Sequence, residues 1–479
     1  MSDLQYMSAI EMAAAIREKS LSSAEALEGL LARIGERDGP LNIVVTLDEE
    51  RARADAEAAD EETARGESRG PLHGVPMTIK DSFCTKGVRT TSGAPELSDH
   101  IAENDAVPVA RLRGAGAVIF AKTNLPIYAG DVQSYNEVFG TSNNPWNVEY
   151  AVGGSSGGSG AALAAGFTPL ELGSDIGGSI RNPAHCNGVM GHKSSFRLVP
   201  ALGQIPGPPG TLTQADIAVA GPMARTVDDL ELGLDVMAGP DDWEGVGYKL
   251  DLPTARGKAL SDFKVAAWID DDFCPLASEV STLLNRAVDE VERAGAAVDR
   301  HARPDFEFAY ANGVFSQLIG AAMCGGYSLK DIEKLAADIE SGNTITGAEN
   351  AVLRHRAWLS ANERRLQMRR KWFEFFKSYD VVLMPVSPTT AIPHDHSEPQ
   401  WGRKIKIDGA ERDYGEQIRW MGLTGVSYLP ATVVPVGVTR AGLPVGIQIA
   451  GPYLEDRTTL AVARGLADRM GGFQPPPGF

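Results

Sequence analysis

The sequence contains few cysteines and no long apolar run. Its four cysteines, Cys84, Cys186, Cys274 and Cys324, are far apart and form no CxxC pair, which argues against a disulfide framework and a structural zinc site. No stretch approaches the roughly 18 apolar residues that a transmembrane helix needs. The N-terminal residues also lack the basic start and apolar segment of a secretory signal. We therefore expect a cytoplasmic protein that does not bind membranes.

Basic residues are fewer than acidic residues. The chain of 479 residues has 45 Lys and Arg against 63 Asp and Glu, which gives a net charge of −18. Such a charge disfavours attraction to nucleic acids and to anionic membranes, so neither is an expected partner. Hydrophobic residues make up 43% of the chain, which is enough for a large buried core.

Short apolar segments alternate with helical patterns along most of the chain. Apolar runs typical of buried strands occur at 42–47, 75–79, 117–121, 264–268, 381–385, 431–436 and 445–450, and helical spacing occurs at 7–19, 22–37, 48–65, 106–113, 226–237, 278–294, 344–377 and 456–470. This alternation predicts an α/β fold, in which helices cover a central sheet. No clean linker divides the elements, so one large domain is expected.

Two serines stand in glycine-rich surroundings between residues 153 and 183. Ser155 lies within GGSSGGSG, and Ser179 follows Gly177 and Gly178. Glycine removes side chains and leaves main-chain N–H groups accessible, and such groups stabilise an oxygen that becomes anionic in a transition state. The pattern therefore indicates a hydrolytic serine.

Other interpretations of this stretch stay open. A run of Gly and Ser is typical of a flexible linker, and a phosphate-binding loop would need a GK[ST] ending, which is missing here. Residues 153–157 also match GxSxG, the nucleophile elbow of α/β-hydrolases, which would make Ser155 the nucleophile. An elbow follows a buried strand, whereas residues 143–147 are loop-like.

A lysine and several histidines compete for the role of base. His73, His185 and His192 lie near the key segments, so a Ser-His-Asp arrangement is open on chemistry alone. Lys80 ends the apolar run 75–79. A lone lysine in such a place is usually a solvated surface charge, and it can accept a proton near neutral pH only if burial lowers its pKa from about 10.4.

Taken together, these segments resemble the amidase signature family, whose members are serine hydrolases with a Ser-cisSer-Lys triad. The resemblance rests on Gly154-Ser155-Ser156-Gly157-Gly158, on Gly173-Ser174-Asp175-Ile176-Gly177-Gly178-Ser179-Ile180-Arg181 with Pro183, and on Gly74-Val75-Pro76 followed by Lys80-Asp81. It is strong over residues 70–238 and returns at 424–452. Three segments in the family's order make a chance match improbable.

The resemblance implies a role for each matching residue. Ser179 takes the place of the nucleophile, Ser155 that of the proton relay and Lys80 that of the general base, with a cis Gly154–Ser155 peptide bond. The oxyanion hole is implied to consist of main-chain amides, those of Ile176, Gly177, Gly178 and Ser179. The residues implied to support the site are Ser156, Asp175 and Arg181. Asp175 and Arg181 are expected to hold the loop by an ion pair.

The resemblance also implies how the chain is organised. It predicts a single amidase domain over residues 1–479, in which a central mixed sheet is flanked by helices. The domain comprises an N-terminal helical segment (1–70), a signature core (71–238), a variable, substrate-selecting region without a matching motif (239–416), and C-terminal strands with a helix (417–479). In relatives a loop beside the nucleophile forms one wall of the substrate pocket, and Ala129, Gly130 and Asp131 match it.

The expected activity is hydrolysis of a small, linear carboxamide through an acyl-enzyme, without metal or organic cofactor. The fragment His394-Asp395-His396 lacks a third ligand, so a solvated loop is expected there. Activity should rise towards alkaline pH, whereas a bell centred near pH 6 would indicate histidine catalysis. Two alternatives stay open: a glutamine-hydrolysing subunit of an aminoacyl-tRNA amidotransferase, and a noncatalytic ligand-binding protein. A homodimer is a reasonable expectation.

Overall fold

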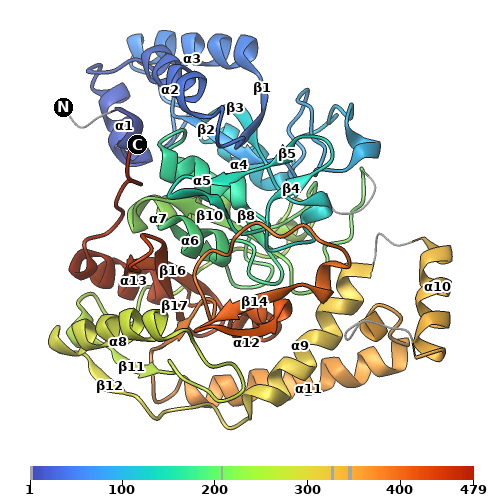
Figure 1. Ribbon diagram of the computed structural model, residues 1–479. Helices are drawn as coiled ribbons and strands as arrows, with labels where there is room; N and C mark the ends of the chain where they lie inside the picture. The colour runs from blue at the N-terminus through green and yellow to red at the C-terminus, as the bar shows by residue number, and fades with distance from the viewer. Residues whose placement is uncertain (1–3, 206–208, 325–327, 343–347) are drawn as a thin grey trace.

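A mixed sheet of eleven strands runs through the computed structural model, which describes residues 4–205, 209–324, 328–342 and 348–479 (Figure 1). The strands lie in the order β1-β3-β2-β8-β10-β9-β16-β17-β13-β11-β12. Their bounds are β1 Val44–Leu47, β2 Pro76–Lys80, β3 Val118–Thr123, β8 Leu170–Asp175, β9 Met190–Lys193, β10 Val219–Ala224, β11 Lys264–Ala267, β12 Ala297–Asp299, β13 Val381–Pro385, β16 Ala431–Val438 and β17 Pro444–Ala450. The C-terminal strands thus continue the sheet that the signature strands begin.

Strands β2 and β8 are neighbours in the sheet, and their carboxyl ends lie at the same edge. β2 pairs in parallel with both β3 and β8, and every residue of β2 and β8 is buried. Carboxyl ends of parallel strands meet at the same edge of a sheet, which is where α/β folds place their ligands. Lys80 ends β2 and Asp175 ends β8, so both residues lie at this edge.

Thirteen helices of the described residues cover and flank the sheet (Figure 1). Their bounds are α1 Ala9–Arg17, α2 Ser23–Arg37, α3 Glu49–Ala64, α4 Val107–Gly114, α5 Gly157–Ala165, α6 Arg181–Asn187, α7 Val227–Met237, α8 Ser278–Arg293, α9 Phe308–Met323, α10 Leu329–Glu340, α11 His355–Phe375, α12 Arg419–Val426 and α13 Asp456–Met470. The first two begin with capping boxes, formed by Ser8 with Glu11 and by Ser22 with Glu25, which satisfy main-chain N–H groups that a helix start leaves unpaired.

Helix α5 shows why the serine segment needs its glycines. All nine of its residues are buried, so it packs on every side against other parts of the protein. A Cβ atom at Gly158 would lie 2.5 Å from the main-chain nitrogen of Asn124, and one at Gly157 would lie 2.3 Å from Ser134 Oγ. The glycines therefore let the segment that carries Ser155 approach its neighbours closely.

Three hairpins lie outside the large sheet. They pair β4 (Tyr135–Asn136) with β5 (Gly140–Thr141), β6 (Asn143–Asn144) with β7 (Asn147–Ala151), and β14 (Lys404–Ile407) with β15 (Ala410–Asp413). β7 is mostly exposed and precedes Ser155. Ser155 therefore does not follow a strand of the central sheet, and the buried strand that a nucleophile elbow requires is absent from this place.

The predicted α/β architecture is confirmed, and so are most of the elements expected from periodicity. The helix expected at 344–377 begins only at His355, and residues 344–347 of that prediction lie outside the described part of the chain. In the large sheet, strands β9, β10 and β12 were not predicted, and neither were helices α6, α9, α10 and α12. β9 and β10 are buried but contain Gly, Pro, His and Lys, so they lack the apolar runs that reveal a buried strand.

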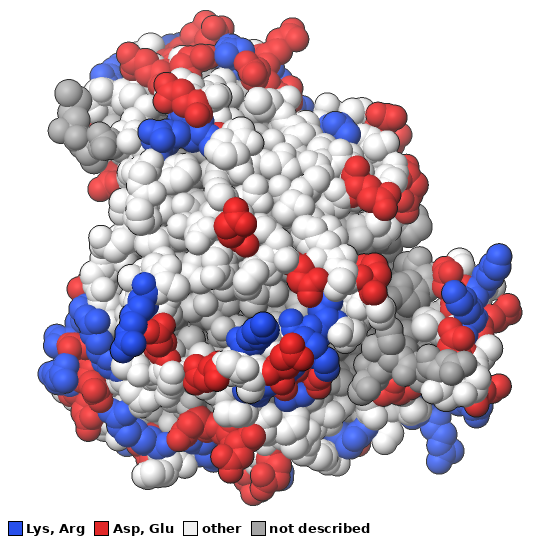
Figure 2. Space-filling view, viewed as in Figure 1, with Lys and Arg blue, Asp and Glu red and all other residues white. Residues whose placement is uncertain are grey.

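The surface carries its charge unevenly. Figure 2 shows acidic side chains gathered over the N-terminal helices α2 and α3 and a broad area with few charges below them, while acidic and basic groups are mixed over the C-terminal part. Among the described helices, none is both long and apolar enough to span a membrane.

Candidate active site

Lys80 is a buried lysine surrounded by three serine hydroxyls. Its Nζ lies 2.7 Å from Ser155 Oγ and 3.0 Å from both Ser156 Oγ and Ser174 Oγ. The residue has no solvent exposure, and among the described residues its ammonium forms no ion pair. The structure thus brings the predicted lysine and the predicted relay serine into direct contact.

Burial gives Lys80 the properties of a base. Loss of hydration lowers its pKa to about 7, while the more distant charges of Asp175 and Glu171 act in the opposite direction. Removing an ammonium from water disfavours its charged form. A substantial fraction of Lys80 is therefore neutral near pH 7 and able to accept a proton.

The segment that carries Ser155 is held against its neighbours on both sides. The Gly154–Ser155 peptide bond is cis, as the resemblance implies. A Cβ atom at Gly154 would lie 2.4 Å from the main-chain oxygen of Asp131, so the loop of residues 129–133 lies directly against it. On the other side, the N–H of Ser156 donates to the main-chain oxygen of Ser179 over 3.0 Å. The two serine segments are thus joined.

Ser179 is the most exposed member of this group. It keeps 8% of its surface, against 1% for Ser155 and none for Lys80. Its hydroxyl has no hydrogen-bond partner among the described residues. It lies between the end of β8 and the start of α6. A substrate that approaches from solvent would reach this hydroxyl before the others.

The loop before Ser179 offers main-chain N–H groups, but one of the predicted donors is already engaged. Within the described residues, the amides of Ile176, Gly177 and Ser179 have no acceptor, whereas the Gly178 N–H donates to Asp175 Oδ1 over 2.8 Å. The backbone of Gly178 has φ +119°, and a Cβ there would lie 2.2 Å from Met421 Sδ. Glycine is therefore required at this position.

A buried ion pair fixes the shape of this loop. Arg181 Nε donates to Asp175 Oδ2 over 2.9 Å and Arg181 Nη2 donates to Asp175 Oδ1 over 2.8 Å; neither side chain is exposed. Burial alone would raise the pKa of Asp175, but the Arg181 guanidinium lowers it to about 2. Arg181 Nη1 also bonds the carbonyl of Met421. The expected ion pair is present, and it anchors the serine loop to α12.

The predicted pocket loop is itself tied down by charge. Asp131 Oδ2 accepts from Arg403 Nη1 over 2.7 Å, and Asp131 Oδ1 accepts from the Tyr414 hydroxyl over 2.6 Å. The carbonyl of Gly130 accepts from Gln400 over 2.9 Å. The loop of residues 129–131 thus connects the segment at 400–414 to the Ser155 segment, and the Asp131 carboxylate is used within the protein. Its role as a pocket wall stays a prediction.

Histidines take no part in the serine cluster of the described residues. His192 bonds Thr432 and Asp456, and burial lowers the pKa of His185, which accepts from the Gly446 N–H. His73 Nε2 is within hydrogen-bond distance of the Ala59 carbonyl. A Ser-His-Asp arrangement at Ser155 or Ser179 is therefore not present.

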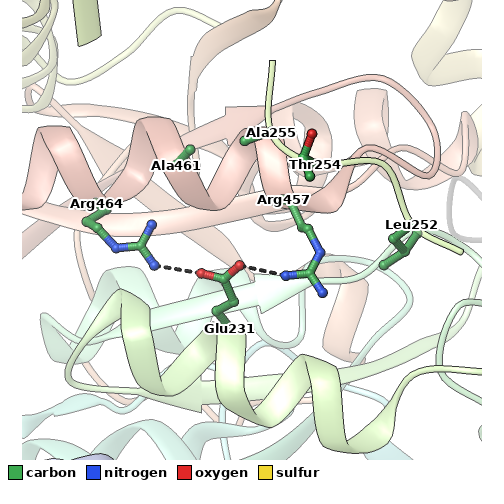
Figure 3. A pocket seen from close by; sticks show the side chains of 7 residues that line it. All are labelled: Glu231, Leu252, Thr254, Ala255, Arg457, Ala461 and Arg464. Atoms are coloured by element: carbon green, nitrogen blue, oxygen red, sulfur yellow. Dashed lines mark hydrogen bonds and ion pairs between the residues drawn. The ribbon is translucent and has the colours of Figure 1, made fainter. Parts of the chain in front are cut away.

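A metal site and a surface hollow are two alternatives to the serine cluster. Among the described residues, no group of three His, Cys, Asp or Glu side chains is placed to hold a metal ion, and His396 stacks on Tyr135. A hollow of about 330 Å³ lies between α7 and α13, where Arg457 and Arg464 both bond Glu231 (Figure 3). None of the residues that line it belongs to the serine cluster, so it is separate from the site.

Two residues of this cluster were not singled out from the sequence. Ser174 contacts Lys80 directly, although its position within the matched motif was the only signal. Glu171 lies two strand positions before Gly173 with no solvent exposure, and burial raises the pKa of its carboxyl to about 7. A single acid inside an apolar strand was the sign that could have drawn attention to it.

Comparison with known proteins decides the family. The family model described as "Amidase" matches residues 25–460. The chain belongs to the amidase family. Its relatives include an indoleacetamide hydrolase of Bradyrhizobium diazoefficiens, which is 35% identical over 97% of this chain and 86% of that protein. A glutamyl-tRNA(Gln) amidotransferase subunit of Alkaliphilus metalliredigens is 30% identical over 99% of this chain and 98% of that one.

Solved structures of the amidase family agree with this placement. A bacterial aryl acylamidase of the amidase signature enzymes superposes with a TM-score of 0.77 at 25% identity, over 98% of this chain and 97% of that chain. The protein is therefore a serine amidohydrolase of the amidase family, which acts on carbon–nitrogen bonds of amides.

Proposed function

We propose that the protein hydrolyses a small linear carboxamide, with Ser179 as nucleophile, Ser155 as proton relay and Lys80 as general base. The observation that carries this proposal is the 2.7 Å contact between Lys80 Nζ and Ser155 Oγ in a place without solvent exposure. A neutral amine beside a hydroxyl can receive its proton, and that hydroxyl can in turn receive the proton of a second serine.

The reaction then proceeds in two halves. In the first, Ser179 Oγ forms a bond to the carbonyl carbon, its proton moves to Ser155 Oγ and the Ser155 proton moves to Lys80 Nζ. The carbonyl oxygen becomes anionic and is met by the free N–H groups of the loop. When the intermediate collapses, the C–N bond breaks and the amine leaves with a proton returned through Ser155. In the second half, water adds to the acyl-enzyme by the same relay and releases the carboxylate.

The surroundings of the loop favour an uncharged, apolar acyl group. A Cβ at Gly177 would lie 3.1 Å from Ile319 and 4.0 Å from Ile418, so partly buried aliphatic side chains of α9 and of the segment before α12 lie beside the free amides. Apolar walls with a few polar groups are typical of small-molecule sites. Ile319 belongs to residues 239–416, for which we propose a substrate-selecting role, whereas Ile418 follows that region.

Charged neighbours support the same choice of substrate. The guanidinium of Arg181, at the serine loop, is paired with Asp175, and that of Arg403, at the loop of residues 129–131, is paired with Asp131. A free amino acid such as glutamine carries a carboxylate, which would need an uncommitted cation. An arylacetamide of the kind named for the relative from Bradyrhizobium needs none. We therefore favour a free-standing amidase over one component of an amidotransferase, and a homodimer stays a prediction.

Labelling with a fluorophosphonate, followed by peptide mapping, tests the assignment of the nucleophile. We expect the label on Ser179, because this residue is the most accessible of the cluster and its hydroxyl has no hydrogen-bond partner among the described residues. A label on Ser155 would overturn the assignment, and no label at all would favour a noncatalytic binding protein. Steady-state rates with phenylacetamide and with glutamine then test the substrate: preference for glutamine, or copurification with other subunits, would contradict a free-standing amidase.

A further inference from the structure

Glu171 is a second buried ionisable group on the strand next to Lys80. It is the Cα partner of Thr78 in the parallel pair of β8 and β2, and the Thr78 hydroxyl donates to Glu171 Oε1 over 2.6 Å. Side chains two residues apart leave a strand on the same face, so Thr78 and Lys80 share a face of β2. The carboxyl of Glu171 therefore lies on the face from which Lys80 rises.

A third strand closes this arrangement. Thr123 of β3 is the Cα partner of Lys80, and its hydroxyl donates to Glu171 Oε1 over 3.0 Å while it lies 3.1 Å from Ser159 Oγ of α5. The N–H of Leu172 donates to Glu171 Oε2 over 3.0 Å. Helix α5, which begins just after the Ser155 segment, thus covers both Lys80 and Glu171.

Neither group has an ordinary ionic partner. In the described part of the chain, no Lys, Arg or His forms an ion pair with Glu171, whose neighbours are hydroxyls and one N–H. Lys80 likewise has only hydroxyls within hydrogen-bond distance. A buried charge without a partner is costly. The Glu171 carboxylate, like that of Asp175, favours the charged form of Lys80 and does so across the layer of threonine hydroxyls.

We propose that Glu171 is a positioning residue that sets the protonation state of Lys80 from beneath the triad. When Glu171 is ionised it favours the Lys80 ammonium, and when it is protonated it favours the neutral amine that the reaction needs. This inference rests on the proposed role of Lys80 as general base. It assigns to the strand β8 a second acid that acts on the base, besides Asp175.

Among the charged groups that face Lys80, Glu171 is the one whose charge changes near neutral pH. From β8, Asp175 is held ionised by Arg181 of α6, so its charge does not change near neutral pH. From β9, Lys193 acts on Asp175 and lies near Arg181. On β3, Lys122 bonds the Thr85 hydroxyl on the other face of the sheet. Burial raises the pKa of Glu171 to about 7 and lowers that of Lys80 to about 7, so both change charge in the same range of pH.

The test is the pH dependence of Ser179 labelling by a fluorophosphonate, measured as a second-order rate constant in the wild type, Glu171→Gln and Glu171→Asp. Loss of the carboxylate removes a charge that stabilises the ammonium, so in Glu171→Gln the ascending limb should move to lower pH by at least about half a unit. Glu171→Asp keeps the charge, and its limb should stay within the error of the wild type. A purely structural role would lower all rates without moving the limb.

A second variant keeps the proposal testable if Glu171→Gln does not fold. Thr123→Val removes one hydroxyl that stabilises the carboxylate, so the limb should move in the same direction by a smaller amount. Folding is checked by near-UV circular dichroism. A limb that stays in place in whichever of these variants folds, or that moves to higher pH, would overturn the proposal. Absence of a label on Ser179 in the wild type would instead overturn the proposed function on which it rests.

Discussion

Two lysines of this protein are equally buried but have different hydrogen-bond partners. Lys80 and Lys193 are both without solvent exposure, and burial lowers the pKa of each to about 7. Lys80 Nζ is surrounded by the hydroxyls of three serines. Lys193 Nζ donates instead to two main-chain carbonyls, those of Leu429 over 2.7 Å and of Ser194 over 3.2 Å.

The difference shows that burial alone does not make a base. A hydroxyl can accept a hydrogen bond from an ammonium and can also donate one to a neutral amine, whereas a carbonyl can only accept. The neutral form of Lys80 therefore keeps a donor beside its lone pair, and in the proposed reaction the proton of that donor moves to Lys80. The neutral amine of Lys193 would face two carbonyl acceptors, and neither of them has a proton that it could donate to the nitrogen lone pair. We infer that Lys193 holds the α12–β16 connection to β9.

The largest expected effect comes from replacing each lysine by the apolar residue of similar length. Lys80→Met should lower kcat/KM by about 10²–10⁴-fold, the usual contribution of a general base, because within the described part of the chain no other amine contacts Ser155. Lys193→Met should change kcat/KM by less than about tenfold, but it leaves two carbonyls without their donor and should cost about 1–3 kcal/mol of stability.

Both variants are compared by steady-state kinetics and by thermal unfolding at one pH. Equal losses of activity in folded Lys80→Met and Lys193→Met would break the distinction between the two sites. Full activity in Lys80→Met would show that the triad has been assigned to the wrong base.

A smaller effect is expected from the hydroxyls themselves. Ser174→Ala removes one of the bonds to Lys80 Nζ and should lower kcat/KM by about 10- to 150-fold, since a hydrogen bond to a charged group contributes about 1.5–3 kcal/mol. Ser194→Ala is the matched control: its buried hydroxyl donates to the Ala220 carbonyl over 2.7 Å, next to Lys193. Its kcat/KM should stay close to that of the wild type. A larger loss in Ser194→Ala than in Ser174→Ala would contradict the comparison.

Sequence reasoning identified the residues that the structure brings together at the candidate site because compact motifs carry them. Ser155 and Ser156 are adjacent, and Lys80 ends an apolar run that forms a buried strand, so the predicted contact of Lys80 with the Ser155 segment is present in the structure. The glycines mark where backbone must approach backbone, as at Gly158 and Gly178. The roles of these residues in catalysis stay proposals.

The residues that sequence reasoning missed act across strands rather than along the chain. Glu171 contacts Thr78 and Thr123 only because β2 lies between β3 and β8. The local periodicity of a sequence does not predict such a strand order. The same applies to Asp131, which bonds Arg403 from a segment far along the chain. The Gly178 amide was also misjudged, although its partner is close in the sequence. The Asp175 carboxylate that accepts its hydrogen bond lies only three residues earlier, but a motif does not show which N–H groups are free.

The smallest expected effect concerns stability, and here the two lysines should behave alike. In the unfolded chain a lysine has a pKa of about 10.4, whereas burial lowers the pKa of Lys80 and of Lys193 in the folded protein to about 7. Above pH 7 the unfolded chain therefore binds more protons than the folded one, and the free energy of unfolding rises with pH by about 1 kcal/mol per pH unit for each lysine. Two other buried groups act in the same range: the pKa of Lys122, lowered by burial to about 8, adds to the rise, whereas the pKa of Glu171, raised by burial to about 7, opposes it near pH 7.

The measurement is the apparent Tm between pH 7 and about pH 8.5, compared among the wild type, Lys80→Met and Lys193→Met. The Tm of the wild type should rise over this range, and each variant should rise less steeply by a similar amount, because stability responds to burial whereas activity responds to the partners of the amine. A flatter slope in only one variant would show that the two lysines are not equally deprotonated in the folded protein. The difference in activity between the two variants would then follow from the different pKa values of the lysines, and not from the hydroxyl partners of Lys80 and the carbonyl partners of Lys193.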